Sequence, residues 1–291
     1  MLIELKDIRH IYQLDDPVVA LDGVNLEIER GEFLGLIGHT GSGKSTLVQL
    51  LNGLLKPSEG QVFFEGRDIN SQEVELKEIR RRVGLVFQYP EHQLFEETVA
   101  RDIAFGPKNA GLSEEEIENR VREALELVGL DYESFKDRSP FNLSGGQQRR
   151  IAIAGVLALK PEVLILDEPM AGLDPAGRRK LLELLIHLHR ELEITVILIS
   201  HRMEEIARLA DRVLVMDRGK IVLQGRPAEV FTERERLKEI DLDLPVVTDI
   251  LKKLEEKGLK VRTDIFALEE ARDEILSALE KQSQFRESRP C

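Results

Sequence analysis

Short apolar runs alternate with longer helical patterns through most of the chain. Because the runs are rich in Val, Ile and Leu and helical patterns separate them, the sequence predicts an α/β fold with a mixed, largely parallel sheet. Two earlier runs alternate apolar and polar positions, which predicts antiparallel strands at one edge of that sheet. The expected buried strands are Phe33–Ile37, Val83–Phe87, Val163–Leu166, Thr195–Ile199 and Val213–Met216, and the expected edge strands are Ile3–Ile8 and Val18–Ile28.

Two stretches of the chain are purely helical in pattern. Between about residues 91 and 160 the strand patterns stop, and Ser113 with Glu116 forms a capping-box pattern followed by apolar residues at helical spacing. We expect a helical subdomain inserted into the α/β core. Beyond residue 225, apolar stripes predict short amphipathic helices. The expected domains are therefore 1–225, the core with its insertion, and 226–291, a small helical domain.

Charge and hydropathy narrow the class of function. The 291 residues include 41 Lys and Arg against 54 Asp and Glu, a formal net charge of −13. Such a chain has no general cationic field for nucleic acid, so we expect no nucleic-acid partner. No apolar run approaches the roughly 20 residues that span a bilayer, so we expect any membrane role to require a partner. A single cysteine, Cys291, excludes an intramolecular disulfide.

A phosphate-binding loop follows the expected strand Phe33–Ile37. Glycines there let backbone N–H groups turn toward phosphate oxygens, and the next helix adds positive charge at its N-terminus. We expect Lys44 to reach the β- and γ-phosphates and the Ser45 hydroxyl to bind Mg²⁺. A P-loop alone leaves kinases, GTPases, helicases and transport ATPases open. The loop consists of Gly38, His39, Thr40, Gly41, Ser42, Gly43, Lys44, Ser45 and Thr46.

Two acids end the expected strand Val163–Leu166. Asp167 is expected to hold Mg²⁺ through its water shell, and Glu168 to polarise the attacking water as a general base. Ligands bind at the carboxyl ends of strands in such sheets, so these acids and the P-loop are expected to meet there. Together they predict a phosphoryl-transfer site.

A second glycine-rich loop precedes the helix expected over Gln148–Leu159. Its residues Ser144, Gly145, Gly146 and Gln147 form another anion site at a helix N-terminus. A γ-phosphate already wrapped by a P-loop is approachable only from its open side, so a second subunit is expected to supply this loop. With Leu143, these residues match the signature of the ATP-binding cassette (ABC) ATPases, which the chain resembles over about residues 2–225.

The resemblance implies an ATP-binding, ATP-hydrolysing protein and adds four site residues. Tyr12 matches the aromatic residue that stacks on adenine, and Gln88 matches the glutamine that contacts Mg²⁺ or the attacking water. Asp174 matches the D-loop, where it also fits as an N-cap before Pro175. His201 matches the histidine that touches the γ-phosphate.

The segment from Phe87 to Asn109 is similar to the ATPase subunits of energy-coupling-factor (ECF) transporters, including the cobalt and nickel importers. Within that group, residues 105–109 and 153–158 are more like the second of the two related ATPases. The resemblance implies a groove after Gln88 that receives arginine-bearing helices of a transmembrane T subunit. It also implies that the C-terminal domain contributes dimer contact. The residues expected in the groove are Glu91, Gln93, Glu96 and Glu97; the alternative is a solvated acidic face.

These patterns predict a peripheral ATPase on the cytoplasmic face of the cell membrane. It would pair with an identical chain or a related ATPase around two ATP molecules and power uptake of a vitamin or transition-metal ion, which a separate S subunit would bind. The first alternative is the ATPase of another ABC importer or exporter. A soluble ABC protein acting on nucleic acid or ribosomes is less favoured, because such proteins usually carry two cassettes or a long coiled coil.

Overall fold

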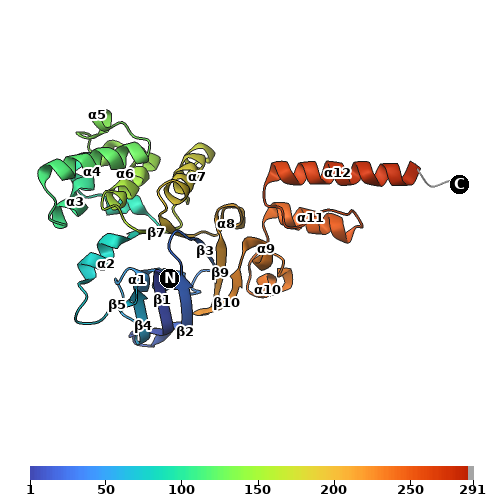
Figure 1. Ribbon diagram of the computed structural model, residues 1–291, viewed down its shortest axis with the longest axis horizontal. Helices are drawn as coiled ribbons and strands as arrows, with labels where there is room; N and C mark the ends of the chain where they lie inside the picture. The colour runs from blue at the N-terminus through green and yellow to red at the C-terminus, as the bar shows by residue number, and fades with distance from the viewer. Residues whose placement is uncertain (288–291) are drawn as a thin grey trace.

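The computed structural model describes residues 1–287, so Cys291 lies outside it. Its centre is a six-stranded sheet in the order β10-β9-β3-β8-β7-β6 (Figure 1). Neighbouring strands run parallel except β10, which is antiparallel to β9. This confirms the predicted, largely parallel α/β sheet. The strands are β3 (Phe33–Ile37), β6 (Val83–Val86), β7 (Val163–Asp167), β8 (Thr195–Ile199), β9 (Arg212–Asp217) and β10 (Lys220–Gly225).

The antiparallel strands form a sheet of their own, in the order β2-β1-β4-β5. Strand β1 (Ile3–Tyr12) pairs with β2 (Val18–Ile28) on one side and with β4 (Glu59–Phe64) on the other. Because both edges of β1 are taken, it does not join the six-stranded sheet, and the expectation of an edge on that sheet was wrong. The fourth strand, β5 (Arg67–Asp68), pairs with β4.

Two apolar cores flank the six-stranded sheet. One lies between the sheets and includes Leu5 of β1, Leu47 of α1 (Lys44–Leu51) and Ile165 of β7. The other joins Leu164 of β7 and Leu198 of β8 to the helices on the opposite face. Those helices include α7 (Pro175–Arg190), α8 (Met203–Leu209) and the helical insertion. Helix α2 (Leu76–Arg82) leads into β6.

The helical insertion follows β6. It contains η1 (Pro90–Gln93), α3 (Val99–Asn109), α4 (Glu114–Leu127), α5 (Tyr132–Phe135), η2 (Pro140–Asn142) and α6 (Gly145–Leu157). The predicted capping box is present at α4, where Glu116 N donates to Ser113 Oγ at 3.3 Å and Ser113 N donates to Glu116 Oε2 at 3.1 Å. Helix α6 begins at Gly145, three residues before the expected start, because Ser144 caps it.

The C-terminal helices project from the side of the molecule opposite the helical insertion (Figure 1). They are α9 (Pro227–Val230), α10 (Arg234–Glu239), α11 (Val246–Glu256) and α12 (Leu268–Glu287). A small apolar cluster that includes Leu251, Ile265 and Ala271 joins α11 to α12. In residues 1–287, no helix combines the length and the apolar character needed to cross a membrane.

Candidate nucleotide site

The site segments follow the carboxyl ends of neighbouring strands. The P-loop follows β3, Asp167 ends β7 with Glu168 next to it, and His201 lies two residues after β8. Gln88 lies two residues after β6, at the edge of the same sheet. Residues scattered over more than a hundred positions are thus gathered at one end of the sheet, where ligands bind in this fold class.

Two P-loop glycines are required by the backbone and its neighbours. Gly43, which immediately precedes α1, has φ +104°, and a Cβ there would lie 2.6 Å from the Ala20 carbonyl oxygen. A Cβ on Gly38 would lie 2.3 Å from the Met216 carbonyl oxygen. Any other residue would therefore clash with backbone and open the loop. The α1 N-terminus, with no acidic residue in its first turn, supplies the partial positive charge that attracts phosphate.

Lys44 points into the loop that precedes it. Its Nζ donates to the carbonyl oxygens of Gly38 and His39, both at 2.8 Å, and to Ser42 Oγ at 3.3 Å. Burial lowers the pKa of Lys44, while the carboxylates of Glu168 and Asp167 act in the opposite direction. The ammonium group thus lies inside the cradle formed by the loop, where it can meet phosphate oxygens.

The donor set beside the P-loop fits a hard cation. Ser45 Oγ donates to Asp167 Oδ2 at 2.9 Å, which puts two oxygen ligands of the kind that Mg²⁺ prefers next to each other. Burial raises the pKa of Asp167, against the Ser45 hydrogen bond and the charge of Lys44. Among the side chains that the structure describes, those of residues 1–282, no group of three or more His, Cys, Asp and Glu could hold a metal alone. An ion here would therefore share its coordination with phosphate and water.

Glu168 is held in an uncommon backbone conformation. Its φ is +49°, in the left-handed region that non-glycine residues rarely adopt, and its N–H donates to the Ile199 carbonyl oxygen at 3.0 Å. The Oε1 atom of Glu168 is 2.6 Å from His201 Nε2. A carboxylate only accepts, so Nε2 carries the hydrogen of this bond. The structure thus brings two of the three predicted catalytic side chains, Glu168 and His201, into direct contact at the strand ends, while Gln88 has no hydrogen bond with either of them.

Tyr12 lies against the P-loop helix. Its hydroxyl is 3.1 Å from Thr46 Oγ1, and its ring meets the His10 ring edge-on, with centroids 4.8 Å apart. This places an aromatic side chain beside the predicted phosphate cradle.

Asp217, which was not predicted from the sequence, lies beside the P-loop: its Oδ1 atom is 2.7 Å from His39 Nε2. The sequence contained one indication of Asp217: it is an acid at the end of a strand, β9, just as Asp167 is at the end of β7.

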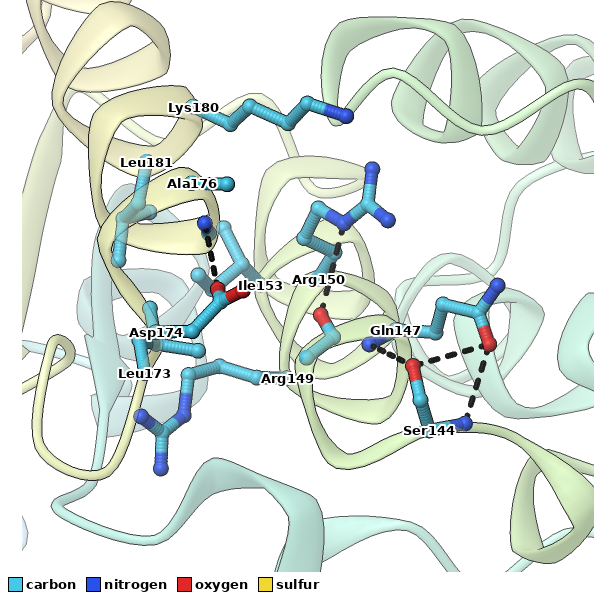
Figure 2. Close-up of a pocket in the computed structure, with 12 residues that line it drawn as sticks. Ser144, Gln147, Arg149, Arg150, Ile153, Leu173, Asp174, Ala176, Lys180 and Leu181 are labelled. Atoms are coloured by element: carbon cyan, nitrogen blue, oxygen red, sulfur yellow. Dashed lines mark hydrogen bonds between the residues drawn. The ribbon is translucent and has the colours of Figure 1, made fainter.

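The signature loop lies in another part of the chain, at the start of α6 (Figure 2). Gln147 N donates to Ser144 Oγ at 3.4 Å and Ser144 N donates to Gln147 Oε1 at 3.0 Å, a second capping box. Asp174 caps α7 by accepting from Gly177 N at 2.7 Å. Both helix starts border a cavity of about 230 Å³. Within the described residues, Ser144 and Gln147 form no hydrogen bond with the P-loop.

The four residues expected to face a partner differ in their surroundings. Glu91 forms an internal ion pair with Arg149, with Oε1 and Nη2 3.1 Å apart, and its side chain is only 22% exposed. Its carboxylate is therefore already paired within the chain, and its contact with a partner stays a prediction. Glu97 is exposed and pairs with Arg101 at 2.7 Å on the surface. Glu96 and Gln93 are half-buried, and their side chains have no hydrogen-bond partner among the side chains and backbone described for residues 1–282.

Comparison with known proteins places this geometry in a family. The family model described as ABC transporter matches residues 21–171. The energy-coupling factor transporter ATP-binding protein EcfA2 of Clostridium tetani is 55% identical over 278 residues, which cover 95% of this chain and 96% of that relative.

Two solved structures extend the comparison. The protein cbiO1 of Clostridium perfringens, described as part of the ABC transporter complex cbiONQ, matches with a TM-score of 0.72 at 41% identity, over 86% of this chain and 98% of that one. A dimeric ATP-binding cassette in a post-hydrolysis state, bound to ADP and Pi, matches with a TM-score of 0.70 at 31% identity, over 78% of this chain and 99% of that one. The likeness therefore covers the nucleotide site and most of the remaining chain.

Proposed function

Since the chain belongs to the ABC transporter family, and within it to the ATP-binding proteins of energy-coupling factor transporters, we propose that it powers uptake of a vitamin or transition-metal ion through a transmembrane T subunit. It is the ATP-hydrolysing subunit that energises import in such a transporter. In this proposal it is peripheral, at the cytoplasmic face of the cell membrane, and a separate S subunit binds the cargo.

The working unit in this proposal is a pair of cassettes. Ser144 and Gly145 are exposed at the start of α6, and the first turn of that helix contains no acidic residue. A partner cassette can therefore present this N-terminus to the open side of the phosphate bound by the P-loop around Lys44. The similar cassette bound to ADP and Pi is a dimer. The partner here is a second copy of this chain or a related ATPase.

Each predicted side chain has a role in hydrolysis. Lys44 neutralises phosphate charge, Glu168 accepts a proton from the attacking water, and His201 orients Glu168 through their 2.6 Å contact. Ser45, Asp167 and Gln88 would hold Mg²⁺, which when bound offsets charge on the β- and γ-phosphates. Tyr12 would stack on adenine, a contact worth about 1–3 kcal/mol for bases on aromatic side chains.

The observation that carries the docking proposal is an exposed aromatic and acidic surface after β6. Phe95 is 56% exposed and Phe105 is 47% exposed, and their rings pack edge-on with centroids 4.9 Å apart. Exposed aromatic side chains are typical anchors of protein interfaces. Glu96 and Glu97 precede α3 beside them, so a helix that carries apolar and arginine side chains would match this surface in both shape and charge.

The proposal is tested by reversing charge at this surface. The double variant Glu96→Lys, Glu97→Lys should weaken association with the T subunit by at least about tenfold, because attraction to arginines becomes repulsion. Affinity for ATP should stay within about twofold, since neither side chain reaches the P-loop. Co-purification of the tagged chain from native membranes, with mass spectrometry of the bound subunits, measures the association.

A matched control carries the same change of charge elsewhere. Glu27 on β2 and Glu235 on α10 are exposed, and both lie away from the helical insertion (Figure 1). The variant Glu27→Lys, Glu235→Lys should co-purify with its partners as the wild type does. Equal recovery of the T subunit with both double variants would refute the docking surface, while leaving the ATPase assignment intact.

A further inference from the structure

Arg149 is the most completely bonded side chain near the signature loop. It lies on the second turn of α6, and only 6% of its side chain is exposed. Nε donates to Glu91 Oε2 at 3.3 Å, and Nη2 donates to Oε1 at 3.1 Å and Oε2 at 3.2 Å. Nη1 donates to the carbonyl oxygens of Pro169, at 3.0 Å, and Ala171. All three guanidinium nitrogens are therefore used.

These bonds connect three functional segments. Glu91 belongs to η1, three residues after Gln88, and Arg149 belongs to the signature helix α6. Pro169 and Ala171 lie just after Glu168, in the segment that leads to Asp174. Figure 2 shows the Arg149 side chain extending from α6 toward Leu173 and Asp174. Residues 90–97, which contain η1 and lead into the proposed docking surface, are called the docking segment below. One guanidinium group thus joins this docking segment, the signature helix and the segment that carries the general base.

The segment after Glu168 needs such support. A left-handed backbone at a glutamate costs on the order of 1 kcal/mol and persists only where neighbours fix it. Glu168 is fixed on its N-terminal side by the bond to Ile199 and at its carboxylate by His201. On its C-terminal side, Arg149 binds the carbonyl oxygens of the first and third residues after it. The backbone bond from Ala171 N to the Glu168 carbonyl oxygen, at 3.2 Å, does not depend on Arg149, so loss of the Arg149 bonds would loosen the segment without releasing it fully.

We propose that Arg149, held by Glu91, is a positioning residue for Glu168. The ion pair fixes the guanidinium group, and the guanidinium group fixes the backbone that aims the Glu168 carboxylate at the attacking water. The inference rests on the proposed role of Glu168 as general base. Because Glu91 lies in the docking segment, a partner that displaces η1 would shift Arg149 and change the rate of hydrolysis without touching the nucleotide.

The test compares kcat and KM for ATP in the transporter complex that contains the full-length chain. Glu91→Gln keeps the size of the side chain and removes its charge, whereas Glu91→Asp keeps the charge. We expect Glu91→Gln and Arg149→Lys to lower kcat by about tenfold to a hundredfold, the effect of small misplacements of a catalytic group. KM for ATP should stay within about twofold, because nucleotide binding is not involved. Glu91→Asp should retain more of kcat than Glu91→Gln.

A second ion pair separates positioning from general stability. Glu32 pairs with Arg212, Oε1 to Nε, at 2.6 Å; these side chains are 11% and 27% exposed. Glu32 precedes β3 and contacts none of the site residues. Glu32→Gln should lower Tm at least as much as Glu91→Gln and leave kcat unchanged. If Glu91→Gln does not fold, Glu91→Asp is compared with Glu32→Asp in its place.

The outcomes are distinct. A selective loss of kcat in the Glu91 and Arg149 variants supports the proposal. Lower Tm with unchanged kcat in those variants, as in Glu32→Gln, would overturn it and leave the pair a structural contact. Glu168→Gln, measured in parallel, checks the premise: if it abolishes hydrolysis while Glu91→Gln keeps the wild-type kcat, only the positioning role fails. Near-normal hydrolysis by Glu168→Gln would overturn both.

Discussion

At the scale of single residues, the backbone at Glu168 and the chemistry of its carboxylate are linked. Among the residues that the structure describes, seven non-glycine residues have positive φ, and Glu193 has nearly the same value, +52°, as the +49° of Glu168. Glu193, however, lies in the exposed turn between α7 and β8 and does not contact the site. The two glutamates share a backbone conformation and differ in function, so they form a matched pair for mutagenesis.

Replacing the carboxylate of Glu168 should remove hydrolysis and leave binding. We expect Glu168→Gln to lower kcat by about 10²–10⁴, the usual contribution of a general base, with little change in affinity for ATP. Steady-state phosphate release and equilibrium nucleotide binding measure the two effects. Glu193→Gln, the control with the same backbone, should behave as the wild type. Hydrolysis within about threefold of the wild type in Glu168→Gln would exclude it as the base.

From the sequence alone we could predict residues that belong to local motifs. We could not predict residues whose role depends on a partner far away in the chain. Lys44 and Asp167 could be predicted because each follows a predicted strand in a motif of fixed composition, whereas His201 was predicted from the family resemblance. Arg149 and Asp217 could not be assigned a role, since their partners, Glu91 and His39, are 58 and 178 positions away. An ion pair of that separation leaves no local pattern. The pairing of Glu91 with Arg149 was hidden for the same reason, and the place of Glu91 in a partner groove, which the family resemblance implies, stays a prediction.

At the scale of elements, a ring of four ion-paired side chains connects the antiparallel sheet to the six-stranded sheet. Arg30 after β2 and Arg82 at the end of α2 each pair with both Glu65 and Glu162. Glu65 follows β4 and Glu162 precedes β7, so the ring joins the antiparallel sheet to the start of the parallel one. Strands β4 and β5 were not predicted, because their short, partly polar pattern gives little periodicity over so few residues.

The ring should stabilise the fold in a pH-dependent way. Hydrogen bonds from Arg82 and Arg30 lower the pKa of Glu162 in the folded protein. A lowered carboxyl pKa adds stability above the ordinary value near 4.3, and that stability is lost as the pH falls through the folded pKa. We expect Glu162→Gln to reduce the free energy of unfolding by about 1–2 kcal/mol at pH 7, allowing for partial exposure.

The measurement is the urea unfolding free energy of wild type and variant between pH 3 and pH 7. The difference between them should shrink as the pH falls below the ordinary carboxyl value near 4.3, because the unfolded chain then takes up its proton before the folded protein does. Glu118→Gln is the control, because its carboxylate is 60% exposed and pairs with Arg122 on the surface at 3.2 Å. It should change stability by less than about 0.5 kcal/mol. A pH-independent deficit in Glu162→Gln would contradict the linkage.

At the scale of the whole molecule, the helices expected beyond residue 225 are present, but their position relative to the core could not be predicted from the sequence. Their arrangement depends on α9 and α10, which pack Phe231 and Leu237 against the core and set the direction in which the chain continues into α11. Helices α11 and α12 then stand away from the core with a small cluster of their own (Figure 1). Apolar side chains on α12 face outward: Leu268 is 68% exposed, Leu276 is 52% and Leu279 is 48%.

These leucines should contribute to pairing of two cassettes. At 100° per residue, Leu268, Leu276 and Leu279 fall on one side of α12, beside the face that packs on α11. Burying each leucine in a dimer is worth up to about 1.5–3 kcal/mol, less the entropy of ordering. Leu276→Gln with Leu279→Gln should therefore weaken dimerisation of the ATP-bound Glu168→Gln chain by about tenfold or more.

Sedimentation velocity over a concentration series measures the dimer dissociation constant. Tm of the monomer should be unchanged, because both side chains are already exposed to water in the single chain. Leu192→Gln, a leucine 46% exposed in the turn after α7, is the control for lost surface apolarity and should dimerise as the parent does. If the double variant dimerises with the parent's dissociation constant, these leucines do not contribute to pairing.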